Sequence, residues 1–261
     1  GMISAAFALG FVFGPSIGGV LSQNFGYSFP VYISAALSLI AALLCIFIFK
    51  ETLSKEIQLK NRLSKRKYNP FNLRIFLTAL SNKSYGKYMI IFFVAVFSFS
   101  NIFGTFQLFA ERKEGLNMNQ AEIGYIFSFM GVMGALVQIF LLKIINKKIG
   151  EENTLILGSF IAIFGLGLIG FSTNLIFLLF VIVILSVGNG LNNTVSISML
   201  SQSVGKEEQG TILGINQSLG SLARFLGPVW GGFVYQFLGY KYPFLTGGLF
   251  MLIITLYSYF I

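Results

Sequence analysis

Apolar stretches long enough to cross a lipid bilayer follow one another along almost the whole chain. A membrane helix needs about 20 predominantly apolar residues, and glycine or proline does not disqualify a stretch because both are common in such helices. The composition agrees, since 55% of the residues are hydrophobic and only 10% are charged. We therefore predict an all-α membrane protein with eight spans at 3–22, 29–49, 87–110, 121–145, 154–172, 175–200, 211–236 and 242–261.

The residue types that the chain lacks exclude most classes of catalytic site. The chain contains no His and no Asp, and its single cysteine, Cys45, lies within an apolar stretch. His-dependent metal sites, Ser-His-Asp and Cys-His catalysis and a disulfide within the chain are therefore excluded. We expect no enzyme, no cofactor and no metal.

One connection, 50–86, is long and basic and has no apolar stretch of spanning length. Its segment NPFNLRIFLTAL predicts either a short amphipathic helix on the membrane surface or a solvated linker. With this loop in the cytoplasm, 14 of the 18 Lys and Arg residues lie inside and three outside, as the positive-inside rule requires. This bias accounts for the net charge of +9, so we expect no nucleic-acid partner.

A segment near the start of the chain recurs near its end. GPSIGGVLSQNFGYSFP at 14–30 matches GPVWGGFVYQFLGYKYP at 227–243, and aligning residues 1–30 with 214–243 gives ten identities. The two copies lie in the first and seventh spans, so both cross the membrane in the same direction. This arrangement is typical of two similar half-proteins related by an axis along the membrane normal.

Completing this symmetry requires four more spans upstream. In the second half, four spans precede the repeated helix, whereas none precedes it in the first. We expect about 130 preceding residues, which makes Gly1 an interior residue of a twelve-span protein. The chain then divides into the last two spans of an N-terminal half, 1–49, a cytoplasmic central loop, 50–86, and a C-terminal six-helix half, 87–261.

The repeated helices combine small residues with a proline. Gly10, Gly14 and Gly18 share one face, which lets another helix approach closely. Pro15 has no N–H, so the carbonyl of Phe11 loses its usual donor and the helix bends or softens there. The spacing alone is explained by ordinary helix packing, but its duplication favours a gating helix in each half. The predicted gating residues are Gly10, Gly14, Pro15, Gly18, Gly19, Gly227, Pro228, Gly231 and Gly232.

Polar side chains within the spans predict a substrate cavity. Arg224 lies near the centre of its span, where a charge costs about 3 kcal/mol unless it faces protein or water. We interpret it as a substrate or counter-ion residue; a structural ion pair with a carboxylate outside this chain is the alternative. Interhelical hydrogen bonds would explain any single Asn or Gln. The predicted substrate-binding residues are Asn101, Gln107, Gln138, Asn189, Asn193, Gln217, Ser221 and Arg224, and Asn192 and Ser196 belong to the same polar stretch as Asn189.

No glutamate lies in the middle of a predicted span. Proton coupling usually needs a carboxylate or histidine within the membrane. We expect the coupling residue in the upstream spans; otherwise the protein is not driven by protons.

Three stretches carry a resemblance to a known family. GFVFGPSIGG at 10–19 is similar to the antiporter motif of the major facilitator superfamily. EEQGTILGINQSLGSLARFLGP at 207–228 and QIFLLKIINKKIGEE at 138–152 resemble the tetracycline-efflux-like branch of the drug:proton antiporters. Arg224 departs from that branch, in which a small or apolar residue is expected.

The resemblance implies the major-facilitator fold, a parallel six-plus-six helix repeat of which this chain is an eight-span portion. It implies a secondary active transporter that exports small amphipathic molecules by alternating access, in antiport with protons. The expected partners are a small-molecule substrate, protons and the lipid bilayer, with the protein a monomer in a bacterial inner membrane. A metabolite facilitator or symporter is the alternative, and a transport-inactive membrane receptor or scaffold is the second.

Overall fold

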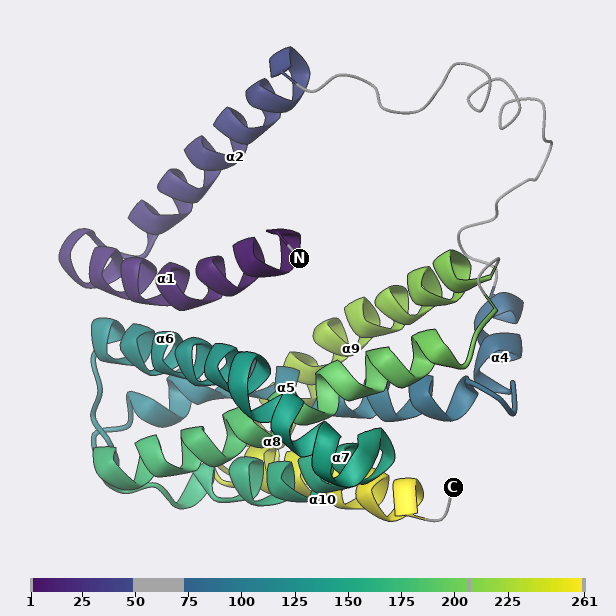
Figure 1. The fold of residues 1–261 in the computed structure, drawn as a ribbon. Coiled ribbons are helices and arrows are strands. Elements are labelled where there is room, and N and C mark those ends of the chain that lie inside the picture. The colour runs from purple at the N-terminus through teal and green to yellow at the C-terminus, as the bar shows by residue number, and fades with distance from the viewer. Residues whose placement is uncertain (1, 49–72, 206–207, 260–261) are drawn as a thin grey trace.

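The computed structural model describes residues 2–48, 73–205 and 208–259, and every regular element in them is a helix (Figure 1). The elements are α1 Met2–Phe25, α2 Ser28–Ile48, α4 Leu73–Leu80, α5 Gly86–Ala110, α6 Gln120–Leu136, the π-helical η1 Val137–Leu141, α7 Leu142–Gly167, the 3-10 helix η2 Ile169–Phe171, α8 Leu175–Gln202, α9 Gln209–Leu238 and α10 Tyr242–Tyr259.

The eight predicted spans coincide with helices, but two of them are joined without a loop. A continuous helical run from α6 to η2 contains one non-helical residue, Gly150, with φ 81° and ψ 169°. Glycine adopts this backbone conformation without steric cost, so the chain turns there between two spans. By length and composition, five helical stretches of the described residues can cross a membrane: Ser28–Ile48, Gly86–Ala110, Gln120–Phe171, Leu175–Gln202 and Tyr242–Tyr259.

The core lies within the six-helix part formed by α5 to α10. Helix α8 packs on α7, α9 packs on α5, and α10 contacts both α7 and α5. Phe106 and Phe244 are among the largest fully buried side chains. Helices α7 and α8 approach closely at Gly188, which has no side chain. A methyl group there would lie only 2.5 Å from the Ala162 nitrogen. Small residues at such contacts are typical of membrane helix pairs.

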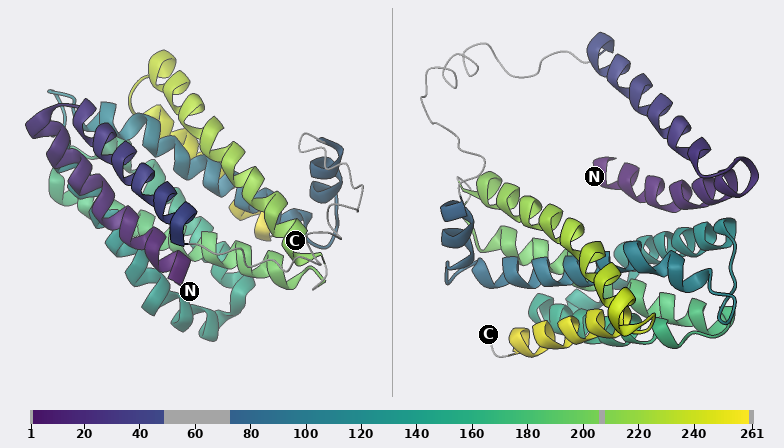
Figure 2. Two further views of the ribbon diagram at one scale, coloured as in Figure 1. Left: turned by 90° about the horizontal axis from the view of Figure 1, so that it is seen from above. Right: turned by 180° about the vertical axis from the view of Figure 1, so that it is seen from behind.

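Helices α1 and α2 lie on one side of this six-helix part, with α1 against α6 (Figures 1 and 2). Helix α2 packs on α1, and none of its side chains is buried by the described residues. Its apolar surface therefore remains available for lipid or for further helices.

Residues Leu73–Leu80 of the segment NPFNLRIFLTAL form the helix α4, whose position on the membrane surface stays a prediction. Ala79 of α4 is buried with Met89 and Ile212, whereas Leu77 is exposed. The rest of the predicted central loop, 49–72, lies outside the described residues.

Candidate functional site

The two copies of the repeated segment have the same local structure. Pro15 and Pro228 both lie inside long helices, α1 and α9. The following turns each contain a glycine with positive φ, Gly26 at 84° and Gly239 at 108°. In both copies the next helix begins within three residues of this glycine, at Ser28 or Tyr242. The repeat seen in the sequence is thus a repeat of backbone conformation.

In the second copy, the glycine face of α9 packs on α5. A methyl group at Gly227 would lie 2.8 Å from the carbonyl oxygen of Phe97, and one at Gly231 would overlap Asn101 Oδ1. Facing them on α5, a methyl group at Gly104 would lie 3.0 Å from Pro228 Cα. Backbone and small side chains therefore meet directly at this pair of helices.

In the first copy, α1 packs on α6 through a different stripe. Methyl groups at Gly19 or Gly124 would overlap the carbonyl oxygens of Gln120 and Pro15, respectively. At Gly131, a methyl group would lie 3.1 Å from Phe11 Cδ1. The contact is therefore as close as that between α9 and α5, but it uses residues on both sides of Pro15.

The glycine face predicted to pack closely on α1 is open in the described residues. No atom of these residues lies within 4 Å of a methyl group placed at Gly10, Gly14 or Gly18. Successive helix residues are rotated by about 100°, so this face points away from the stripe that contains Pro15 and Gly19. Gly232 of α9 is open in the same way.

The two polar residues of α5 predicted to bind substrate differ in their surroundings. Asn101 is 1% exposed, and its Nδ2 donates to the carbonyl oxygen of Pro243 in α10. Gln107 is exposed, and its Nε2 donates to Glu111 Oε1 at 2.9 Å. The structure thus places Asn101 in an interhelical hydrogen bond, which is the alternative that the sequence left open.

The polar stretch of α8 is divided between two environments. Asn192 is buried, and its Nδ2 donates to Ser159 Oγ of α7 at 2.6 Å. Ser196 is also buried, whereas Asn189 and Asn193 are half-buried. Consecutive asparagines point in different directions around a helix, so Asn189 and Asn193 stay partly exposed while Asn192 is buried.

Gln138 lies in η1, where the chain forms one π-helical turn. The Leu142 N–H donates to the carbonyl oxygen of Val137, five residues earlier. Across from it, a methyl group at Gly190 of α8 would lie 2.9 Å from Val137 Cγ1. Such turns are often found at functional sites. This one has no clear signal in the sequence, because most of the residues around Gln138 are apolar.

Gln217, Ser221 and Arg224 share an exposed face of α9. The Arg224 guanidinium Nη2 lies 3.4 Å from Ser221 Oγ. Sequence reasoning grouped these residues by helical spacing, and the structure places their side chains together on the surface of α9.

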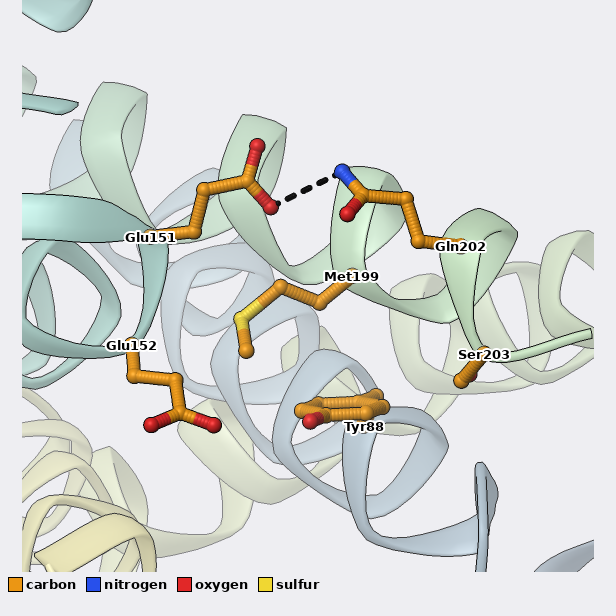
Figure 3. A pocket seen from close by; sticks show the side chains of 6 residues that line it. All are labelled: Tyr88, Glu151, Glu152, Met199, Gln202 and Ser203. Atoms are coloured by element: carbon orange, nitrogen blue, oxygen red, sulfur yellow. Dashed lines mark hydrogen bonds between the residues drawn. The ribbon is translucent and has the colours of Figure 1, made fainter. Parts of the chain in front are cut away.

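A pocket that the sequence did not predict lies where α7 begins its second span (Figure 3). It has a volume of about 400 Å³ and is lined by Tyr88, Glu151, Glu152, Met199, Gln202 and Ser203. Glu151 accepts hydrogen bonds from Ser198 Oγ at 3.1 Å and from Gln202 Nε2 at 3.0 Å. The only sequence signal was a pair of glutamates directly after Gly150.

Comparison with known proteins identifies the family. Residues 1–228 match the family model described as Major Facilitator Superfamily. The chain is 30% identical over 260 residues to Multidrug resistance protein 2 of Bacillus subtilis (strain 168), covering 97% of the chain and 61% of that protein. It is 27% identical over 229 residues to Tetracycline resistance protein, class C, of Escherichia coli, covering 88% of the chain and 56% of that protein.

A solved structure has the same fold. The human organic anion transporter MFSD10 (TETRAN) superposes with a TM-score of 0.69 at 23% sequence identity, over 97% of this chain and 61% of that one. The chain thus spans about three-fifths of the length of the first of these relatives and of the solved structure. The apolar helices of spanning length, the parallel repeat and the family match agree: this chain is a multi-pass membrane protein that belongs to the Major Facilitator Superfamily.

Proposed function

We propose that the chain is the C-terminal portion of a secondary active transporter that exports small amphipathic molecules by alternating access. The observation that carries this proposal is the close contact between α1 and α6, in which the Pro15 carbonyl of α1 meets Gly124 and the Gln120 carbonyl of α6 meets Gly19. A contact made of backbone and glycine slides or opens without repacking large side chains. Rocking of two repeats about such contacts is the general mechanism of transporters with this symmetry.

The relatives support the direction and the substrate class. Two proteins that match most of the chain are named for multidrug and tetracycline resistance, and resistance of this kind is explained by export. Both come from bacteria, so we place the protein in a bacterial inner membrane, with 50–86 in the cytoplasm and the transporter working as a monomer.

We further propose that export is driven by proton antiport and that the coupling group lies outside this chain. The glutamates of the described spans lie at helix ends or in loops, as Glu122, Glu151 and Glu208 illustrate. Four preceding spans, with the central loop joining 1–49 to 87–261, would supply the missing carboxylate. A metabolite facilitator or symporter is the alternative, and a transport-inactive receptor or scaffold is the second; we do not propose an enzyme.

Inverted membrane vesicles that contain the complete transporter test this proposal. The probes are dansylamide, dansylglycine and dansylcadaverine, which share one fluorophore. An exporter coupled to protons concentrates at least one probe inside the vesicles when their lumen is acidified, and a protonophore abolishes the accumulation. Movement that only equilibrates the probe would indicate a facilitator, and no movement relative to vesicles without the protein would leave the receptor or scaffold role.

A further inference from the structure

We infer that the substrates are amphipathic organic anions, whose acidic group binds the Arg224 guanidinium on the open face of α9. This inference rests on the proposed transport function and names its substrate class. It comes from three observations: the surroundings of Arg224, the direction in which its equivalent in the repeat, Phe11, points, and the positions of the described carboxylates.

The guanidinium is accessible and has no acidic partner among the described residues. Arg224 lies at the middle of the 30-residue helix α9 and is exposed. A methyl group at Gly220 would lie 3.4 Å from Arg224 Nη2 and 3.0 Å from Phe92 Cε1, so the charged group lies over Gly220 beside an aromatic ring. Ser221 supplies the neighbouring hydroxyl at 3.4 Å.

The internal repeat indicates what Arg224 faces. In the alignment of 1–30 with 214–243, Arg224 corresponds to Phe11. Phe11 points from α1 toward the other half, where its ring centre lies 6.2 Å from that of Phe103 and its Cδ1 approaches Gly131. In two helices related by symmetry, side chains at equivalent positions each face the opposite half of the protein. Arg224 therefore faces the surface between the two halves, where such transporters bind substrate.

The described carboxylates are too far along the helices to neutralise this charge. Glu111, Glu114 and Glu122 lie in or next to the loop between α5 and α6, whereas Glu151 bonds to Ser198 and Gln202 at the end of α8 and Glu208 directly precedes α9. In Figure 1 the loop between α5 and α6 lies at the opposite end of the fold from the start of α9. Arg224 occupies the middle of its helix, one of the costliest places for a charge in a membrane. A cationic substrate would be repelled there, whereas an anion removes the cost on binding.

The chemistry of the face fits an anion with an apolar body. A guanidinium binds a carboxylate or sulfonate through two parallel hydrogen bonds. Gln217, at helical spacing on the same face, adds an amide donor, while the Ser221 hydroxyl donates to the Gln217 carbonyl oxygen at 3.0 Å and accepts from Arg224. Phe225 beside them is 67% exposed and offers apolar surface to the rest of the molecule.

The same three dansyl probes test the inference, because they are an anion, a neutral molecule and a cation with one apolar body. In inverted vesicles we expect dansylglycine to be transported at least about tenfold faster than dansylcadaverine. Arg224→Gln should lower transport of dansylglycine by about 10- to 100-fold, as expected for loss of a charge-assisted hydrogen-bonded pair, and leave dansylamide within about twofold. Arg224→Lys should recover part of the loss, and Lys113→Gln, which removes an exposed loop charge, should change nothing.

Equal loss of all three probes in Arg224→Gln, together with lower thermal stability, would overturn the inference and indicate a structural ion pair. Preference of the unmodified protein for dansylcadaverine would overturn it as well. If no probe is transported, the proposed function fails, and equilibrium binding to the purified protein decides the inference separately. Arg224-dependent binding of dansylglycine alone would uphold the anion site, and its absence would refute it.

Discussion

The guanidinium carbon of Arg112 lies 3.2 Å from the centre of the Tyr240 ring. This contact joins the loop between α5 and α6 to the turn between α9 and α10. Lys241 Nζ lies 5.0 Å from the centre of the Phe171 ring, which adds η2 to the same cluster. Three connections at this end of the six-helix part are therefore held together by cations on aromatic rings.

Arg112→Ala should destabilise this end of the fold. Loss of the stacked cation is expected to lower the free energy of unfolding by about 1 kcal/mol. Thermal unfolding of the detergent-purified protein measures this change, and Lys113→Ala, at the exposed neighbouring position, is the matched control. An unfolding temperature equal to that of the control would mean that the stack contributes nothing.

Gly124→Leu should block transport while the protein still reaches the membrane. Any side chain at this position overlaps the carbonyl oxygen of Pro15, so α1 and α6 are forced apart. Transport in vesicles and surface amount are measured together. Gly134→Leu on the same helix is the control, because no atom of the described residues lies within 4 Å of a methyl group there. Equal transport by the two variants would contradict a role for the α1–α6 contact.

Gly231→Ala and Asn101→Ala should be strongly non-additive. The alanine methyl group at 231 overlaps Asn101 Oδ1 and would push the amide away from the carbonyl oxygen of Pro243. Removing the amide first relieves most of this overlap, so the double variant should be less destabilised than the sum of the singles by about 1 kcal/mol or more. A thermal-unfolding cycle gives this coupling, and simple additivity would show that the two side chains do not meet.

Glu151→Ala should loosen the start of the second span of α7. The side chain accepts from both Ser198 and Gln202, so its removal takes away two hydrogen bonds to α8, although Gln202 Nε2 keeps its bond to Ser198 Oγ. Amide hydrogen exchange just after Gly150 should accelerate about tenfold, corresponding to roughly 1.4 kcal/mol of local stability. Glu152→Ala is the control, since Glu152 lines the same pocket with an exposed side chain. Similar exchange in both variants would exclude Glu151 as the residue that holds this end.

The orientation of the chain is tested by accessibility. Epitope tags in 55–67 should be reached only from the cytoplasm, and tags in 115–119 only from outside, because the basic loops remain inside. Labelling of intact and permeabilised cells separates the two sides. Reaction of both tags from the same side would overturn the assignment.

Much of the architecture follows from local properties of the sequence. The length of each apolar stretch determines which segments are helices that can span a bilayer, since an unpaired backbone in lipid is too costly. The glycines before α2 and α10, Gly26 and Gly239, take a positive φ because the tight turns need it. The duplicated GPxxGG stretch determined that two helices share one local structure. Helical spacing likewise placed Gln217, Ser221 and Arg224 on one face.

Only the tertiary structure shows which faces of the helices contact one another. Small residues occur on more than one side of α1, so the spacing of Gly10, Gly14 and Gly18 did not show that α6 packs beside Pro15 and Gly19 instead. The division of the polar residues of α8, with Asn192 bound to Ser159, depends on where α7 lies. The physical reason is that helix formation depends on neighbours in the sequence, whereas packing and charge neutralisation depend on atoms brought together from distant segments.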